Sequence, residues 1–132
     1  VMSLRPCILS LFTQETACEV SACLVGSEMC IRDRGEGAHY GRPGRIAGST
    51  NVPAATLLDP ETNAFRPATE IEAALRAAGA MEAARVVPYC GGGIAASVTT
   101  YWLTRLGKEN VALYDASLSE WVSDEALPME VG

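Results

Sequence analysis

One short stretch limits the folds open to this chain more than any other. Residues 86–89 form an apolar run typical of a buried strand, and Cys90 and three glycines lead from it into a helical pattern over 94–106. Residues 71–78 carry apolar side chains at helical spacing, and 111–114 form a second buried-type strand. Alternating strands and helices predict an α/β fold, with a mainly parallel sheet flanked by helices.

The residues at the ends of the predicted helices support this assignment. Residues 69–72 and 117–120 have the spacing of capping boxes, which begin helices. Gly79 and Gly107 follow the two longer helical patterns and fit left-handed caps. Pro88 lies inside the first predicted strand, where it removes a backbone donor from the sheet.

Cys90 lies where such a sheet carries its functional groups. The carboxyl ends of parallel strands open onto a crevice, and the amides of a glycine turn and a first helical turn can point at one spot there. That spot favours a thiolate or a bound anion, so we predict that Cys90 is a nucleophile. The predicted anion-binding residues are the six that follow it, Gly91, Gly92, Gly93, Ile94, Ala95 and Ala96. The alternative is a small buried cysteine in a tight turn.

Three kinds of chemistry fit a strand, a cysteine and a glycine turn. Residues 91–96 match the G-x-G-x-x-A pattern of dinucleotide binding, and Asp115 ends the next strand, but too few residues follow it for the remaining strands of such a sheet. A cysteine phosphatase needs an arginine in the loop, and residues 91–97 contain no basic residue. Sulfur transfer through a persulfide needs only a thiolate and an anion cradle, without metal or histidine. The residues match this third chemistry best.

The charge balance narrows the range of partners. The 132 residues include 10 basic and 16 acidic ones, and the formal net charge is −6. Such a chain is a poor partner for nucleic acid or for an anionic membrane surface. No apolar run approaches the roughly 20 residues of a membrane span.

The first 34 residues differ from the rest and lack its regular alternation of helices and strands. Residues 23–34 resemble the in-frame translation of a transposon-end tag used to prepare sequencing libraries. We interpret 1–34 as a non-native arm joined to a domain over 35–132. The first strand of this domain is then missing or replaced by non-native sequence.

Cysteine usage leads to the same division of the chain. Four of the five cysteines lie in the first 30 residues, and Cys90 stands alone after them. The spacing of Cys23 and Cys30 fits no common zinc motif, and His39 is the only histidine. We therefore expect neither a metal site nor a disulfide framework.

Three motifs resemble those of rhodanese-type sulfurtransferases of the thiosulfate and 3-mercaptopyruvate group. Residues 90–95 resemble the active loop Cys-x-x-Gly-x-(Thr/Ala). Residues 44–53 resemble the signature Gly-His-Ile-Pro-Gly-Ala-x-Asn-(Ile/Val)-Pro, with Arg45 in place of the histidine. Residues 114–121 resemble the closing motif Tyr-Asp-Gly-Ser-x-x-Glu-Trp. Their order is similar to that in the catalytic C-terminal domain of the two-domain form.

The resemblance implies a rhodanese-like fold and a sulfurtransferase. Sulfane sulfur would pass from thiosulfate or 3-mercaptopyruvate to cyanide or a thiol through a persulfide on Cys90, with no cofactor. The resemblance also implies that Arg42 contacts the substrate anion and that the parent protein has a second, N-terminal rhodanese-like domain. The need for a reduced thiol and the lack of a signal segment favour the cytoplasm. The alternative is a non-catalytic rhodanese-like binding module or an inactive fragment.

Overall fold

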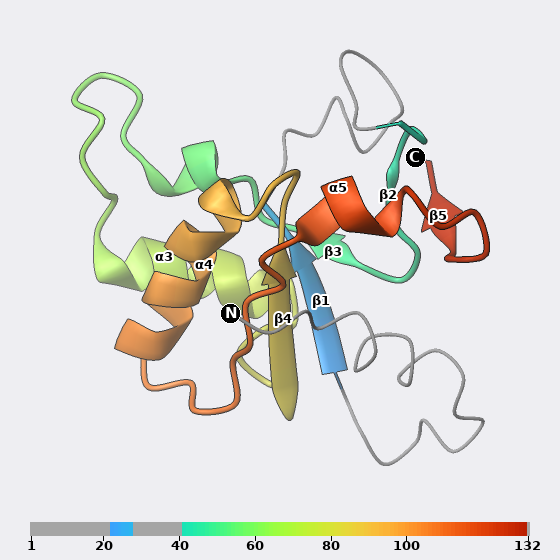
Figure 1. Cartoon of the computed structure of the whole chain (residues 1–132). Coiled ribbons are helices and arrows are strands. Elements are labelled where there is room, and N and C mark those ends of the chain that lie inside the picture. The colour runs from blue at the N-terminus through green and yellow to red at the C-terminus, as the bar shows by residue number, and fades with distance from the viewer. Residues whose placement is uncertain (1–21, 28–40, 132) are drawn as a thin grey trace.

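The computed structural model describes residues 22–27 and 41–131, and it shows a small parallel sheet with helices packed against it (Figure 1). The three strands lie in the order β3 (Thr50–Asn51), β1 (Ala22–Gly26) and β4 (Arg85–Tyr89). Both pairings are parallel. This arrangement confirms the predicted α/β class.

Strand β1 occupies the centre of the sheet, although it belongs to the predicted N-terminal arm. It pairs with β4 along its whole length, with Ala22 opposite Arg85, and with β3 at its carboxyl end. Val25 has none of its surface exposed. Residues of the arm therefore occupy the position of the strand that was predicted to be missing or replaced. The domain that the structure describes includes residues that precede Gly35.

The interpretation of residues 1–34 as non-native stays a prediction. Cys7, Cys18, Cys30 and His39 lie outside the described residues. Cys23 lies within them, in β1, and both described cysteines carry free thiols.

Alternation along β1 and β4 divides the core into two layers, because successive side chains of a strand point to opposite faces. The helices are α3 (Ala68–Ala77), α4 (Ile94–Arg105), α5 (Ser117–Trp121) and the 3-10 helix η1 (Ala54–Leu57). Leu24 and Tyr89 face the layer that contains α5, and Val25 and Val86 face the layer that contains α3 and α4. Figure 1 shows α5 on one side of the sheet and α3 and α4 on the other.

The helix ends confirm the predicted glycine caps and correct the predicted capping boxes. Gly79 and Gly107 have φ values of +80° and +89°, in the left-handed region that ends a helix. No side chain caps α3, which begins at Ala68, one residue before the expected cap Thr69. No side chain caps α5 either, because the hydroxyl of Ser117 is bonded elsewhere.

The predicted strand over 111–114 is wrong as a regular strand. Only a single parallel bridge joins Val111 to Val86. The amides of Ala112 and Tyr114 donate to carbonyls of β4, those of Val86 and Pro88. In this parallel register the next amide of β4 that would donate to the segment belongs to Pro88, which has none. The missing donor interrupts the ladder, so the segment follows β4 without becoming a strand.

A second, two-stranded antiparallel sheet joins β2 (Arg45–Ile46) to β5 (Met129–Glu130). This pairing brings the signature motif of residues 44–53 to the carboxyl end of the described chain. The sequence did not predict it.

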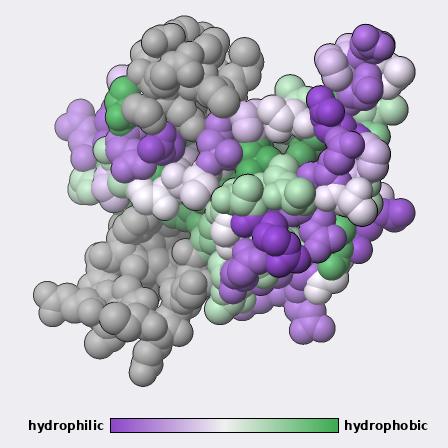
Figure 2. All heavy atoms as spheres, turned by 180° about the vertical axis from the view of Figure 1, so that it is seen from behind, coloured by the Kyte–Doolittle hydropathy of each residue, from purple (hydrophilic) through white to green (hydrophobic). Residues whose placement is uncertain are grey.

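The described surface mixes hydrophilic and hydrophobic residues. Seen from behind, hydrophilic residues cover much of the rim and hydrophobic ones show between them (Figure 2). Among the helices described, none has both the length and the apolar character needed to cross a membrane.

Candidate active site

Cys90 directly follows β4, and three glycines separate it from the first turn of α4. The residue is buried, with 2% of its surface exposed. The backbone N–H of Gly93 donates a hydrogen bond to the Sγ of Cys90 over 3.0 Å. The loop that follows Cys90 therefore directs one of its backbone donors at the sulfur of the cysteine.

Gly93 can only be a glycine in this loop. Its φ is +93°, and a Cβ atom built on it would lie 2.3 Å from the carbonyl oxygen of Asp115. Gly92 differs, because it is exposed and a Cβ atom there would meet nothing within 4 Å. The sharp turn that aims the amide of Gly93 at the sulfur of Cys90 therefore requires glycine at position 93 and does not require it at position 92.

The six predicted anion-binding residues follow Cys90 along the chain as a continuous turn. The three glycines form the loop, and Ile94, Ala95 and Ala96 form the first turn of α4, whose amides have no partners within the helix. Ile94 points outward, with 85% of its surface exposed, and Ala96 is fully buried. Their role in binding an anion stays a prediction.

Helix α5 holds the loop from the side opposite α4. The backbone N–H of Cys90 donates to the Oγ of Ser117 over 3.0 Å. The amide of Leu118 donates to the carbonyl of Cys90, and that of Ser119 donates to the carbonyl of Gly91, each over 2.9 Å. We predicted Ser117 as a helix cap, so its contact with the backbone of Cys90 was missed. No local sequence signal distinguishes the two roles.

The hydrogen bonds of Arg42 go to the carboxyl end of α5 and the chain after it, and not to the glycine loop. Its guanidinium donates four hydrogen bonds to backbone carbonyls at and beyond the carboxyl end of α5, those of Trp121, Val122, Asp124 and Leu127. The two shortest, to Asp124 and Leu127, measure 2.8 Å. The structure therefore shows Arg42 tying down the chain after α5. A contact between Arg42 and a substrate anion stays a prediction.

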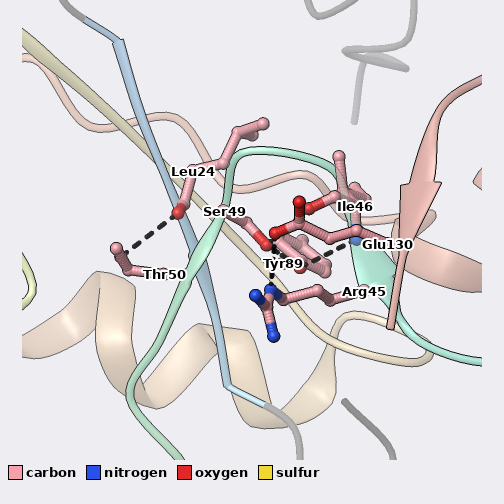
Figure 3. A network of polar contacts seen from close by, with 7 residues as sticks. All are labelled: Leu24, Arg45, Ile46, Ser49, Thr50, Tyr89 and Glu130. Carbon is pink, nitrogen blue, oxygen red and sulfur yellow. Dashed lines mark hydrogen bonds and ion pairs between the residues drawn. The ribbon is translucent and has the colours of Figure 1, made fainter. Parts of the chain in front are cut away.

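A ring of hydrogen bonds joins the strand before Cys90 to the signature motif (Figure 3). The amide of Ile46 donates to the hydroxyl of Tyr89 over 3.3 Å, and the Oγ of Ser49 donates to the carbonyl of Ile46 over 2.7 Å. The hydroxyls of Tyr89 and Ser49 lie 2.6 Å apart. Because the proton of Ser49 is already used, Tyr89 is the donor in this third bond, and all groups of the ring are satisfied.

The same view shows an ion pair at the edge of this network. The Nε of Arg45 lies 2.9 Å from the Oε1 of Glu130, across the β2–β5 pairing (Figure 3). Arg45 stands where the family signature has histidine. Here its charge is matched by a carboxylate of the second sheet.

At the carboxyl end of β4 the structure brings together a thiol and a backbone amide, those of Cys90 and Gly93. Within residues 22–27 and 41–131, no group of three or more His, Cys, Asp or Glu side chains could hold a metal ion. Burial raises the pKa of the other described thiol, Cys23, above its usual range, so Cys23 is held as the neutral thiol. Among the described cysteines, Cys90 alone lies at a strand end with an amide directed at its sulfur.

Comparisons with known proteins agree with this arrangement. The chain is 33% identical over 89 residues to thiosulfate/3-mercaptopyruvate sulfurtransferase 1, mitochondrial, of Arabidopsis thaliana, covering 67% of this chain and 23% of that protein. It is 33% identical over 104 residues to thiosulfate sulfurtransferase YnjE of Escherichia coli, and this match covers 77% of this chain and 23% of that protein. The chain thus spans about a quarter of the length of these relatives.

A solved structure has the same fold. The structure of the Tum1 protein from Saccharomyces cerevisiae matches with a TM-score of 0.72 at 27% identity, over 98% of this chain and 46% of that one. The model of the rhodanese-like domain matches residues 31–124, a range that includes the Cys90 loop and both other motifs. The chain belongs to the family of rhodanese-like domains.

Proposed function

We propose that this chain is a sulfurtransferase that carries sulfane sulfur as a persulfide on Cys90. The observation that carries the proposal is the amide of Gly93, which donates to the Sγ of Cys90 within a glycine turn at the start of α4. The names of the curated relatives support thiosulfate or 3-mercaptopyruvate as the donor class.

In the first half-reaction the Cys90 thiolate attacks the outer sulfur of the donor. With thiosulfate the S–S bond of the donor breaks, and its electron pair leaves with sulfite. With 3-mercaptopyruvate the C–S bond breaks, and the electron pair leaves on carbon as the enolate of pyruvate, which then takes up a proton. In both cases Cys90 gains one sulfur atom, and the amides of the loop stabilise the persulfide anion.

In the second half-reaction a nucleophile attacks the outer sulfur of the persulfide. Cyanide leaves as thiocyanate, or a thiol leaves as a new persulfide, and the electron pair of the broken S–S bond returns to Cys90 as the thiolate. The two half-reactions share one site, so the kinetics are ping-pong. The partners in this scheme are a small-molecule sulfur donor and a cyanide or thiol acceptor.

Two wider proposals accompany this scheme. The three motifs resemble those of the catalytic C-terminal domain of the two-domain form, which supports a parent protein with a second, N-terminal rhodanese-like domain. A nucleophile that must stay reduced supports a reducing compartment such as the cytoplasm.

Mass spectrometry of the Cys90 peptide tests the scheme directly. Trypsin releases residues 86–105 as one peptide, in which Cys90 is the only cysteine. After exposure of the full chain to thiosulfate or 3-mercaptopyruvate, this peptide should gain about 32 Da, and cyanide should remove the gain as thiocyanate. The Cys90→Ser variant should show neither event. Thiocyanate formation by Cys90→Ser at the rate of the parent chain would rule the mechanism out.

A further inference from the structure

Ser117 has a backbone conformation that residues other than glycine rarely adopt. Its φ is +52°, and none of its surface is exposed. Asn63 is the only other described non-glycine residue with a positive φ. A buried serine in this conformation persists only where the surrounding contacts hold it there, and such positions cluster at functional sites.

The hydroxyl of Ser117 both accepts and donates a hydrogen bond. One bond is to the backbone of Cys90, and the other is to the segment that runs beside β4. It accepts the N–H of Cys90 over 3.0 Å and donates to the carbonyl of Tyr114 over 2.6 Å. Tyr114 is itself bound through its amide to the carbonyl of Pro88 in β4. The hydroxyl of Ser117 therefore connects the backbone of Cys90 to the segment of Tyr114, which runs beside β4.

This bond decides which amides can face the sulfur. The N–H of Cys90 donates to Ser117, so this donor is already used by the protein. The carbonyl of Cys90 is held by the amide of the next residue, Leu118, over 2.9 Å. With both backbone groups of Cys90 held by α5, the turn that follows presents the amide of Gly93 to the sulfur.

We propose that Ser117 is a positioning residue for Cys90, and that its hydroxyl, rather than its backbone conformation, sets the reactivity of the thiol. Its part in sulfur transfer rests on the function proposed above. Its effect on the thiol does not, because alkylation of Cys90 reports the same alignment without any sulfur donor.

Two substitutions separate the hydroxyl from the backbone. Ser117→Gly removes the hydroxyl and adopts a positive φ without strain, and Ser117→Ala removes the hydroxyl and keeps the strain. Ser123→Ala is the matched control, because its exposed hydroxyl donates to the carbonyl of Glu120, beyond the contacts with the loop. Thermal melting of each full-length variant shows whether the fold is retained.

The rate of iodoacetamide attachment to Cys90 is followed on the tryptic peptide of residues 86–105, and persulfide formation is followed on the same peptide. Ser117→Gly should react about tenfold or more slowly than the parent in both assays while its melting temperature is retained, because a misplaced sulfur loses its alignment with the loop amides. In a titration with donor, the loss should fall on the maximal rate of persulfide formation and leave the half-saturating concentration unchanged. Ser123→Ala should stay within about twofold of the parent in both assays.

The outcomes separate the two proposals. A folded Ser117→Gly variant that is alkylated at the parental rate overturns the positioning role, whatever its sulfur chemistry. Slowed alkylation of Ser117→Gly in a chain whose parent forms no persulfide supports the positioning role and rejects the proposed function. Equal slowing by Ser123→Ala also overturns the proposal, since that hydroxyl is bonded to Glu120 and not to Cys90.

Discussion

The hydroxyl of Tyr89 donates to the Oγ of Ser49 over 2.6 Å and so connects the residue before Cys90 to the signature motif. Tyr89 is 1% exposed, and its ring lies in the core layer beneath α5. The bond closes a ring through both backbone groups of Ile46. The strand that carries Cys90 is therefore fixed by side-chain bonds as well as by the sheet.

The first prediction concerns this ring. Tyr89→Phe removes the acceptor of a buried amide, that of Ile46, and should lower the free energy of unfolding by about 1–3 kcal/mol. Ser49→Ala breaks the same ring, so the double variant should cost less than the sum of the two single changes. Urea denaturation of the four proteins measures this coupling. Strictly additive costs would mean that the ring does not act as a unit.

The second prediction compares two neighbouring glycines. Gly93→Ala forces a positive φ on alanine and places its Cβ against the carbonyl of Asp115, so it should cost about 2 kcal/mol or more and slow persulfide formation. Gly92→Ala should stay within about 0.5 kcal/mol of the parent, because its φ lies outside the left-handed region and the space is open. Chemical denaturation and the Cys90 peptide assay distinguish them. Equal effects of both changes would contradict the geometry of the turn.

The third prediction decides between two roles of Arg42. Arg42→Lys keeps the charge and loses the fork that reaches four carbonyls, so it should lower the free energy of unfolding by about 2 kcal/mol. The half-saturating concentration of thiosulfate should not change if the residue only ties down the chain after α5. A raised concentration at unchanged stability would instead support the substrate contact implied by the family resemblance.

The fourth prediction tests the central position of β1. Val25→Ala removes two methyl groups from a fully buried site and should cost about 2 kcal/mol. Val131→Ala is the control, because Val131 is 58% exposed and should cost within about 0.5 kcal/mol. A chain of residues 35–132 lacks β1 altogether and should lose its cooperative thermal transition. Cooperative melting of that shorter chain would show that the domain is complete without the arm.

The fifth prediction follows from the raised pKa of Cys23, which arises chiefly because burial disfavours the thiolate. A raised pKa in the folded state stabilises the fold at pH values below the ordinary cysteine range. This stability is lost as the pH rises through the pKa of the folded state, above about 8.5. Stability should therefore fall more steeply between neutral and alkaline pH in the parent than in Cys23→Ala. Parallel curves for the two proteins would indicate that the thiol is not buried in β1.

The elements that were predicted from sequence are those that local physics determines. The helical period over 71–78 and the cap at Gly79 depend only on neighbouring residues, and so does the turn before α4. The same holds for the position of Cys90 between a strand and a helix. Such features are visible in a window of about ten residues.

The features that escaped prediction depend on distant partners. The hydroxyl of Ser117 could cap its own helix or bind another segment, and only the approach of β4 decides between them. The four carbonyls bound by Arg42 come from the far end of the chain. The interrupted segment over 111–114 could be anticipated only by combining its pattern with the missing amide of Pro88 in a neighbouring strand.

The central place of β1 has a consequence for the order of folding. β1 comes first among the described strands during synthesis, yet its longest partner, β4, follows only after α3 has been made. Closing this long loop is slow compared with forming the helices, so α3 and α4 have time to form before the sheet does. Until β4 arrives, β1 is an apolar edge without its main partner, and the nascent chain is exposed to aggregation during that interval.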